Sequence, residues 1–191
     1  MDVKASLSSP AAVRGAVRPV YAVTFLGTLA WIAAIFLAPY LRSRSSGAAS
    51  FLYAIFAPIC HQIPSRCFYF HGFPLAVCGR CLGIYVGFFA GLAAYPFVRG
   101  FNKIALPPVR LFVLLSLPAG IDFAGGLVGA WTSPIWVRFG TGFVWGVLLP
   151  YYLLTGVCEL LLWRSARKGS PSTGASPDRS GLDNPRTKNV E

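Results

Sequence analysis

The chain has 191 residues, of which 55% are hydrophobic and only 12% are charged, and its mean hydropathy is +0.59. Soluble domains average about 25% charged residues, so this composition argues against a soluble domain and predicts an integral membrane protein with one transmembrane bundle. The net charge of +11 does not indicate nucleic-acid binding, because the basic residues lie at the ends of apolar stretches and in a polar tail. We expect the lipid bilayer and its anionic head groups to be their partners.

Four apolar stretches approach the roughly 20 residues that a membrane-spanning helix needs. The first could be a signal peptide, but its apolar region is longer than the roughly 7–15 residues usual there, so we interpret it as a retained anchor. A shorter apolar stretch at 51–58 predicts an interfacial or re-entrant helix. The sequence therefore predicts an all-α fold with spans at 20–41, 78–98, about 109–131 after Pro107 and Pro108, and 139–163.

An even number of spans places both termini on the same side of the membrane. If that side is the cytoplasm, the cytoplasmic segments carry twelve lysines and arginines and the outer segments carry five. The positive-inside bias then predicts that both termini are cytoplasmic, and we expect the location to be a bacterial inner (plasma) membrane. The expected parts are a cytoplasmic arm (1–19), a four-span domain (20–163) with an outward loop (42–80), and a disordered basic tail (164–191).

Glycines recur at every fourth position of the second span, at Gly79, Gly83, Gly87 and Gly91. This spacing places them on one helix face, where another backbone can approach closely. Gly142 and Gly146 repeat the pattern in the fourth span. The periodicity predicts close helix packing and no chemistry of its own.

The segment 60–81 holds four of the five cysteines and both histidines. Two thiols in a Cys-x-x-Cys unit can share a tetrahedral metal ion, and a second pair of ligands completes the site. We predict metal ligands at Cys60, His61, Cys78 and Cys81, with zinc preferred over iron or copper. Adjacent ligands crowd one ion, so Cys67 or His71 could replace one of them.

The same residues allow two other interpretations. A helix N-terminus and Arg80 both favour a thiolate at Cys78 or Cys81, which suits a quinone-linked thiol–disulfide oxidoreductase with these two cysteines as the redox pair. Cys60 and Cys67 would then be the second pair of a relay. In DsbB-like four-span thiol oxidases, however, the second cysteine pair lies in the other outer loop, where this chain has no cysteine. The remaining interpretation is a non-enzymatic membrane scaffold with a disulfide-stapled loop.

Ionisable residues within a membrane are costly and are usually paired or functional. Asp122 lies some 20 Å along the third span, at the predicted depth of Arg66, Arg80 and Arg138. Two hypotheses follow. Asp122 forms a buried ion pair that orients the spans, or Arg80, Asp122 and Arg138 line a pocket near the cysteines.

The motifs "CHQIPSRCF" and "GFPLAVCGRCLGIYVG" resemble the fingerprint of a family of bacterial integral membrane proteins, catalogued as domain of unknown function 2085. "GID" around Asp122 and "RFGTGFVWG" from Arg138 are similar to its second signature. The resemblance covers residues 51–163. It implies that Cys60, His61, Cys78 and Cys81 are motif residues, with Arg80 between the last two. Relatives commonly carry serine where Cys67 stands, which favours three sulfurs plus His61. The resemblance implies no reaction, substrate or cofactor.

Overall fold

The fold is all-α, as predicted. The computed structural model describes residues 10–98 and 108–168, and the remaining parts of the predicted arm and tail, 1–9 and 169–191, lie outside them. A two-stranded hairpin is the only sheet among the described residues. The elements in chain order are α2 (Pro10–Ser43), α3 (Ala48–Phe56), the short 3-10 helix η1 (Pro64–Arg66), β1 (Tyr69–Phe70), β2 (Phe73–Pro74), α4 (Gly79–Val98), α5 (Val109–Leu127) and α6 (Ile135–Lys168).

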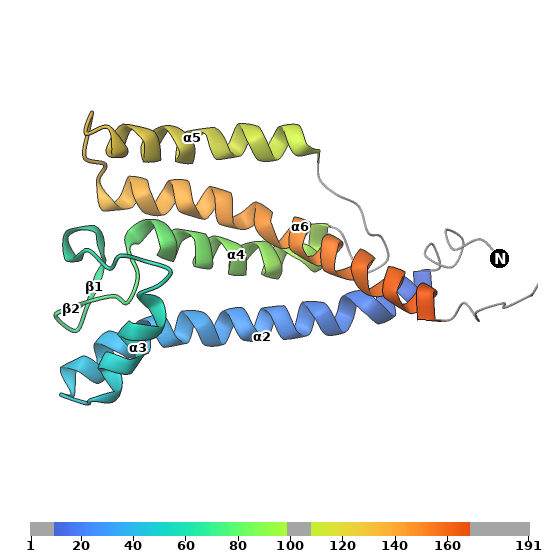
Figure 1. The fold of residues 1–191 in the computed structure, drawn as a ribbon, viewed down its shortest axis with the longest axis horizontal. Coiled ribbons are helices and arrows are strands. Elements are labelled where there is room, and N and C mark those ends of the chain that lie inside the picture. Colours follow the sequence, from blue (N-terminus) through green and yellow to red (C-terminus); the bar gives the residue numbers. More distant parts are fainter. Residues whose placement is uncertain (1–9, 99–107, 169–191) are drawn as a thin grey trace, which may run out of the picture.

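The four long helices lie side by side in the order α5, α6, α4 and α2 (Figure 1). Helices α2 and α5 run toward one end, which we call the loop end because α3, η1 and the hairpin cover it. Helices α4 and α6 run back to the opposite end, which we call the terminal end. Because their directions match, α4 and α6 are parallel neighbours in the centre of the bundle.

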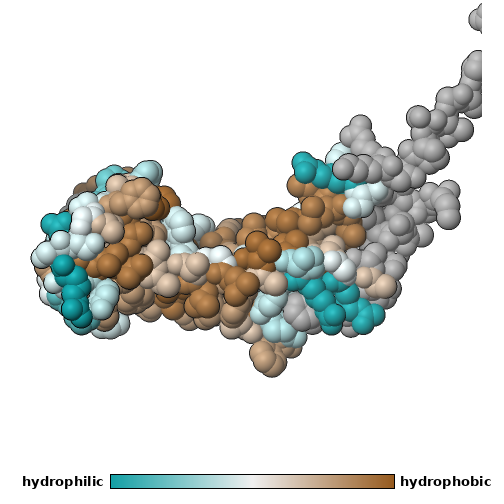
Figure 2. Space-filling view, turned by 90° about the horizontal axis from the view of Figure 1, so that it is seen from below, coloured by the Kyte–Doolittle hydropathy of each residue, from teal (hydrophilic) through white to brown (hydrophobic). Residues whose placement is uncertain are grey.

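All four predicted spans are confirmed as helices long and apolar enough to cross a membrane, at Val13–Ser43, Gly79–Val98, Val109–Leu127 and Ile135–Ser165. Figure 2 shows hydrophobic residues over the middle of the molecule and hydrophilic residues toward both ends. The protein is therefore a multi-pass membrane protein. The predicted short helix at 51–58 corresponds to α3.

Two helices extend beyond their predicted spans. Helix α2 begins at Pro10, within the segment 1–19 predicted as an arm, and α6 continues to Lys168, past the predicted start of the tail. The extra turns of α2 bury Val13 and Val17 against Leu92 of α4 and Leu154 of α6. These contacts extend the helix into the predicted arm. Average hydropathy over a membrane-length segment does not detect such packing.

The contact between α4 and α6 depends on the predicted glycines. A Cβ added to Gly83 would clash with the carbonyl oxygen of Phe139, and one added to Gly87 would clash with that of Phe143. The relation is reciprocal, since a Cβ on Gly142 would clash with the carbonyl oxygen of Arg80. Small residues in both helices therefore let the two backbones touch, as is typical of close-packed membrane helices.

We expect Gly87→Ala to destabilise the protein by about 1–3 kcal/mol, because the new methyl group must push α6 away. Gly140→Ala in α6 is the matched control, since a Cβ at Gly140 meets nothing within 4 Å. Thermal unfolding in detergent should show a lower midpoint for Gly87→Ala alone. Equal midpoints for the two variants would contradict the close contact.

Candidate functional site

A network of hydrogen bonds fixes the loop between α3 and α4. The Tyr53 hydroxyl donates to the Pro74 carbonyl oxygen at 2.5 Å, and the Gln62 side-chain amide donates to the Tyr53 carbonyl oxygen at 2.7 Å. The hairpin turns at His71 and Gly72, which both have positive φ, at 51° and 81°. Positive φ at both central residues is typical of the tight turn that suits the twist of a hairpin. The loop thus has a defined shape between Cys60 and Cys78.

This shape brings three of the predicted ligands together. The sulfur atoms of Cys60, Cys78 and Cys81 all lie within 4.8 Å of one another. Cys60 follows α3, Cys78 lies immediately before α4, and Cys81 lies in the first turn of α4. Cys60 is 5% exposed, and the cluster packs among Ile35, Phe56 and Leu75. We call these three cysteines the thiol triad.

The surroundings of the thiol triad favour a thiolate at Cys78. Hydrogen bonds from the Cys60 and Cys81 thiols, together with the backbone N–H groups of Cys81 and Arg80, lower the pKa of the Cys78 thiol against the opposing effect of burial. The backbone N–H of Cys78 in turn donates to the Cys60 sulfur at 3.1 Å. Cys78 also lies at the N-terminus of α4, where the helix dipole favours negative charge.

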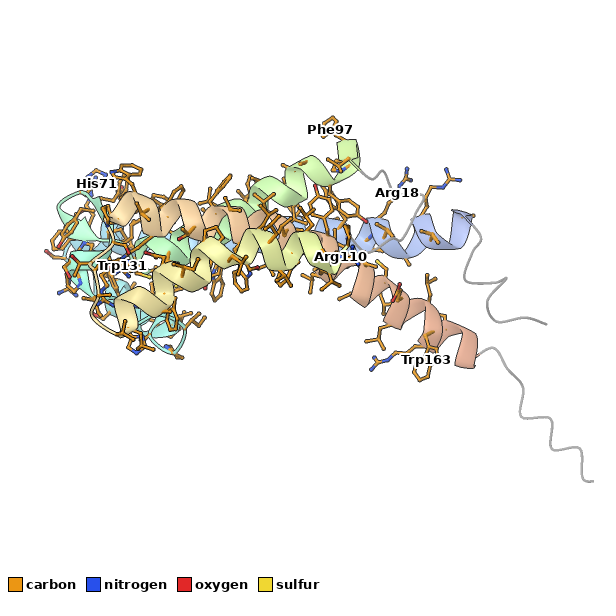
Figure 3. All side chains as sticks on the ribbon, turned by 90° about the horizontal axis from the view of Figure 1, so that it is seen from above. Arg18, His71, Phe97, Arg110, Trp131 and Trp163 are labelled. Carbon is orange, nitrogen blue, oxygen red and sulfur yellow. The ribbon has the colours of Figure 1, made fainter. Side chains whose placement is uncertain are left out.

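The other candidate ligands lie outside the thiol triad. His61 is exposed on the loop beside Cys60. Cys67 is buried and donates from its sulfur to the Ile63 carbonyl oxygen at 3.2 Å. Burial, and to a lesser extent the Cys60 and Cys78 sulfurs, raises the pKa of Cys67 to about 12, so it stays a neutral thiol. His71 lies at the hairpin tip at the loop end (Figure 3), with its ring 5.8 Å from that of Tyr40.

Arg80 and Asp122 form an ion pair near the loop end of the bundle. The Asp122 side chain is 7% exposed and also accepts a hydrogen bond from the Ser133 hydroxyl. Arg138 donates through Nε to the Ser133 carbonyl oxygen at 3.1 Å. Ser133 therefore contacts both Asp122 of α5 and Arg138 near the start of α6. Sequence reasoning missed Ser133, because a single serine in a short connection carries no motif.

A polar pocket of about 220 Å³ surrounds this ion pair and is lined by Arg66, Arg80, Asp122, Phe123, Gly126, Leu127 and Arg138. We call it the arginine pocket. No cysteine lines it, so it is distinct from the thiol triad. Cys78 and Cys81 pack toward α2 and α3, whereas the Arg80 side chain reaches α5. The first turn of α4 therefore separates two chemically different sites.

A second, mostly apolar cavity of about 450 Å³ lies within the membrane-spanning part of α2, α4 and α6. Its lining residues are Thr24, Gly27, Thr28, Trp31, Ile84, Tyr85, Phe88 and Leu149. The ring of Trp31 packs 4.8 Å from that of Phe56, which also contacts the thiol triad. The Trp31 indole N–H is buried without a hydrogen bond of normal geometry, although the Tyr85 hydroxyl is close enough to interact with it.

The four spans and the thiol triad define a multi-pass membrane protein with a cysteine cluster at one end of its bundle. The family described as "Predicted membrane protein (DUF2085)" matches residues 60–152. An uncharacterized protein, MJ1492, of Methanocaldococcus jannaschii is 33% identical over 147 residues, which cover 74% of this chain and 94% of the relative. The chain therefore belongs to this family.

A second relative, an uncharacterized protein of Methanothermobacter thermautotrophicus, is 38% identical over 107 residues, or 56% of this chain and 93% of that protein. Both relatives are archaeal, so they do not support the expectation of a bacterial protein. No solved structure matches this chain.

We expect Asp122→Asn to destabilise the fold by about 3 kcal/mol, because it leaves the Arg80 charge without its counter-charge in a poorly solvated site. Adding Arg80→Gln to Asp122→Asn should recover part of that loss. Ser116→Ala is the matched control on α5, since its hydroxyl bonds only to the Phe112 carbonyl oxygen of the same helix. Thermal unfolding in detergent measures all three, and a double variant no more stable than Asp122→Asn would argue against the ion pair.

Proposed function

We propose that this protein binds one metal ion, zinc in preference to iron or copper, through Cys60, Cys78, Cys81 and His61 on the outer side of the membrane. The single observation that carries the proposal is the convergence of three sulfur atoms within 4.8 Å of one another in a poorly solvated site. Sulfur ligands of a tetrahedral zinc ion, each about 2.3 Å from the metal, lie about 3.8 Å apart. The separations of at most 4.8 Å in the thiol triad are compatible with that spacing.

Charge also supports a cation at this position. Three thiolates so close together repel one another, and burial increases the free energy of that repulsion. A divalent cation offsets the repulsion and holds all three sulfurs deprotonated. The hydrogen bond from the Cys78 N–H to the Cys60 sulfur supplies the kind of second contact that orients metal ligands.

His61 is the fourth ligand in this proposal. It adjoins Cys60 on the same loop, and its side chain is exposed. Cys67 is a poor alternative because its thiol bonds to the Ile63 carbonyl oxygen and resists deprotonation. His71 is held at the hairpin tip by ring contacts with Tyr40 and Phe70.

In the proposed orientation, the terminal end faces the cytoplasm and the loop end faces outward across the cell membrane. The excess of basic residues in the segments assigned to the cytoplasm supports this orientation, as does their expected attraction to anionic lipids. Figure 3 shows Arg18 and Arg110 toward the terminal end and His71 at the loop end.

Labelling in intact cells tests this orientation. Ser45→Cys, an exposed position at the loop end, should react with a membrane-impermeant maleimide in intact cells. Ser165→Cys, exposed at the terminal end, should react only after permeabilisation. The unsubstituted chain provides the background from its own cysteines, and the reverse pattern would overturn the assignment.

The apolar cavity favours a second candidate, a quinone-linked thiol–disulfide oxidoreductase. Aromatic side chains and a buried indole N–H line this cavity on the membrane side of the thiol triad. In such a reaction the Cys78 and Cys81 thiols form one S–S bond and release two electrons and two protons, which reduce a quinone to a quinol. The lowered pKa of Cys78 supplies the reactive thiolate.

Metal analysis of protein purified in detergent separates the two candidates. We expect about one zinc ion per chain, lost in Cys60→Ser, Cys78→Ser and Cys81→Ser because each removes a ligand. Cys67→Ser is the matched control and should retain the metal, while His61→Ala should bind it less tightly. Absence of stoichiometric metal, with a Cys78–Cys81 disulfide that forms and breaks with the quinone pool, would favour the oxidoreductase instead.

A further inference from the structure

The residues that line the arginine pocket carry more positive than negative charge. Three arginines and one carboxylate line it, contributed by four separate elements: η1, α4, α5 and α6. Asp122 forms its ion pair with Arg80. Within residues 10–98 and 108–168, no carboxylate lies within 4.0 Å of a charged nitrogen of Arg66 or Arg138. One carboxylate therefore serves three guanidinium groups: Asp122 pairs with Arg80 and attracts Arg138 at longer range, which leaves the pocket with a net positive charge.

Two of the three guanidinium groups of the pocket, those of Arg80 and Arg138, are held by contacts within the fold. Arg138 is anchored through Nε to the Ser133 carbonyl oxygen at 3.1 Å, and the Arg80 guanidinium lies 5.6 Å from the ring centre of Phe123. The Nε of Arg80 is buried and lacks a hydrogen-bond partner among the described atoms. A buried donor without a partner costs free energy unless something at the site accepts its hydrogen bond.

We propose that the arginine pocket binds a tetrahedral oxyanion, either free phosphate or the phosphate group of a phospholipid. Guanidinium groups present paired N–H donors that match the oxygens of a phosphate, and they bind it more strongly than neutral donors do. A phosphate would meet Arg66 and Arg138, neither of which forms a close ion pair with a carboxylate of the described residues. The cavity of about 220 Å³ is smaller than the usual pocket for a drug-sized ligand, which suits a compact anion.

The position of the pocket suits both free phosphate and the phosphate group of a phospholipid. It lies at the loop end, where α5 ends at Leu127 and α6 begins at Ile135, the level at which lipid head groups and water would meet if these helices span a bilayer. The proposal does not depend on the metal site, because the cysteines pack toward the other side of α4. Failure of either proposal leaves the other untouched.

Phosphate titration in an uncharged detergent tests the free-anion source. The thermal midpoint of the unsubstituted chain should rise with sodium phosphate, compared with sodium chloride at equal ionic strength. Arg66→Gln and Arg138→Gln should each raise the half-saturating phosphate concentration roughly tenfold, the equivalent of one charge-assisted hydrogen bond. Arg44→Gln is the matched control, because Arg44 stacks on Tyr40 and lies outside the pocket.

Native mass spectrometry tests the lipid source with phosphatidylglycerol against diacylglycerol of the same acyl chains. Retention of phosphatidylglycerol alone, reduced by Arg66→Gln but not by Arg44→Gln, would identify a lipid phosphate as the ligand. Arg66 is exposed on η1, so its substitution tests binding without disturbing the packed bundle. If neither phosphate nor phosphatidylglycerol binds, or if Arg44→Gln weakens binding as much as Arg66→Gln, the proposal is wrong.

Discussion

The close contact between α4 and α6 is the constraint on which the other features depend. Glycines from both helices bring the two backbones together, because any side chain there would meet a carbonyl oxygen of the partner helix. Two helices locked at such short range cannot rotate about their axes without a clash. The first turn of α4 therefore has one orientation, and the directions of Cys78, Arg80 and Cys81 follow from it.

One turn of helix consequently serves two sites of opposite electrostatic character. Cys78 and Cys81 meet Cys60 on the side of α2 and α3, where thiolates favour a cation. Arg80 reaches Asp122 on the other side, where the surplus of guanidinium groups favours an anion. The thiol triad packs within an apolar cluster, so charges there interact more strongly than they would in water. The first turn of α4 lies between the two sites.

The features predictable from the sequence are those set by composition and short-range spacing. Hydropathy identified the four spans, period-four glycines identified the packed face of α4, and the Cys-x-x-Cys unit identified two members of the thiol triad. Features set by tertiary contact were not predictable. Val13 and Val17 extend α2 because Leu92 and Leu154 cover them, and Ser133 joins Asp122 because the connection before α6 folds back over α5. Spacing alone also could not decide whether His61 shares the site of Cys60.

Packing contacts contribute to the position of each member of the thiol triad. Cys60 is held by the apolar cluster around Phe56 and Leu75, and the hydrogen bond from Tyr53 to Pro74 fixes the loop that precedes Cys78. The glycine contact places Cys81 independently of both. Because all three positions are set by packing, removal of one sulfur should leave the other two where they are. A cysteine-to-serine variant that loses metal can therefore stay folded, and metal loss can be measured apart from unfolding.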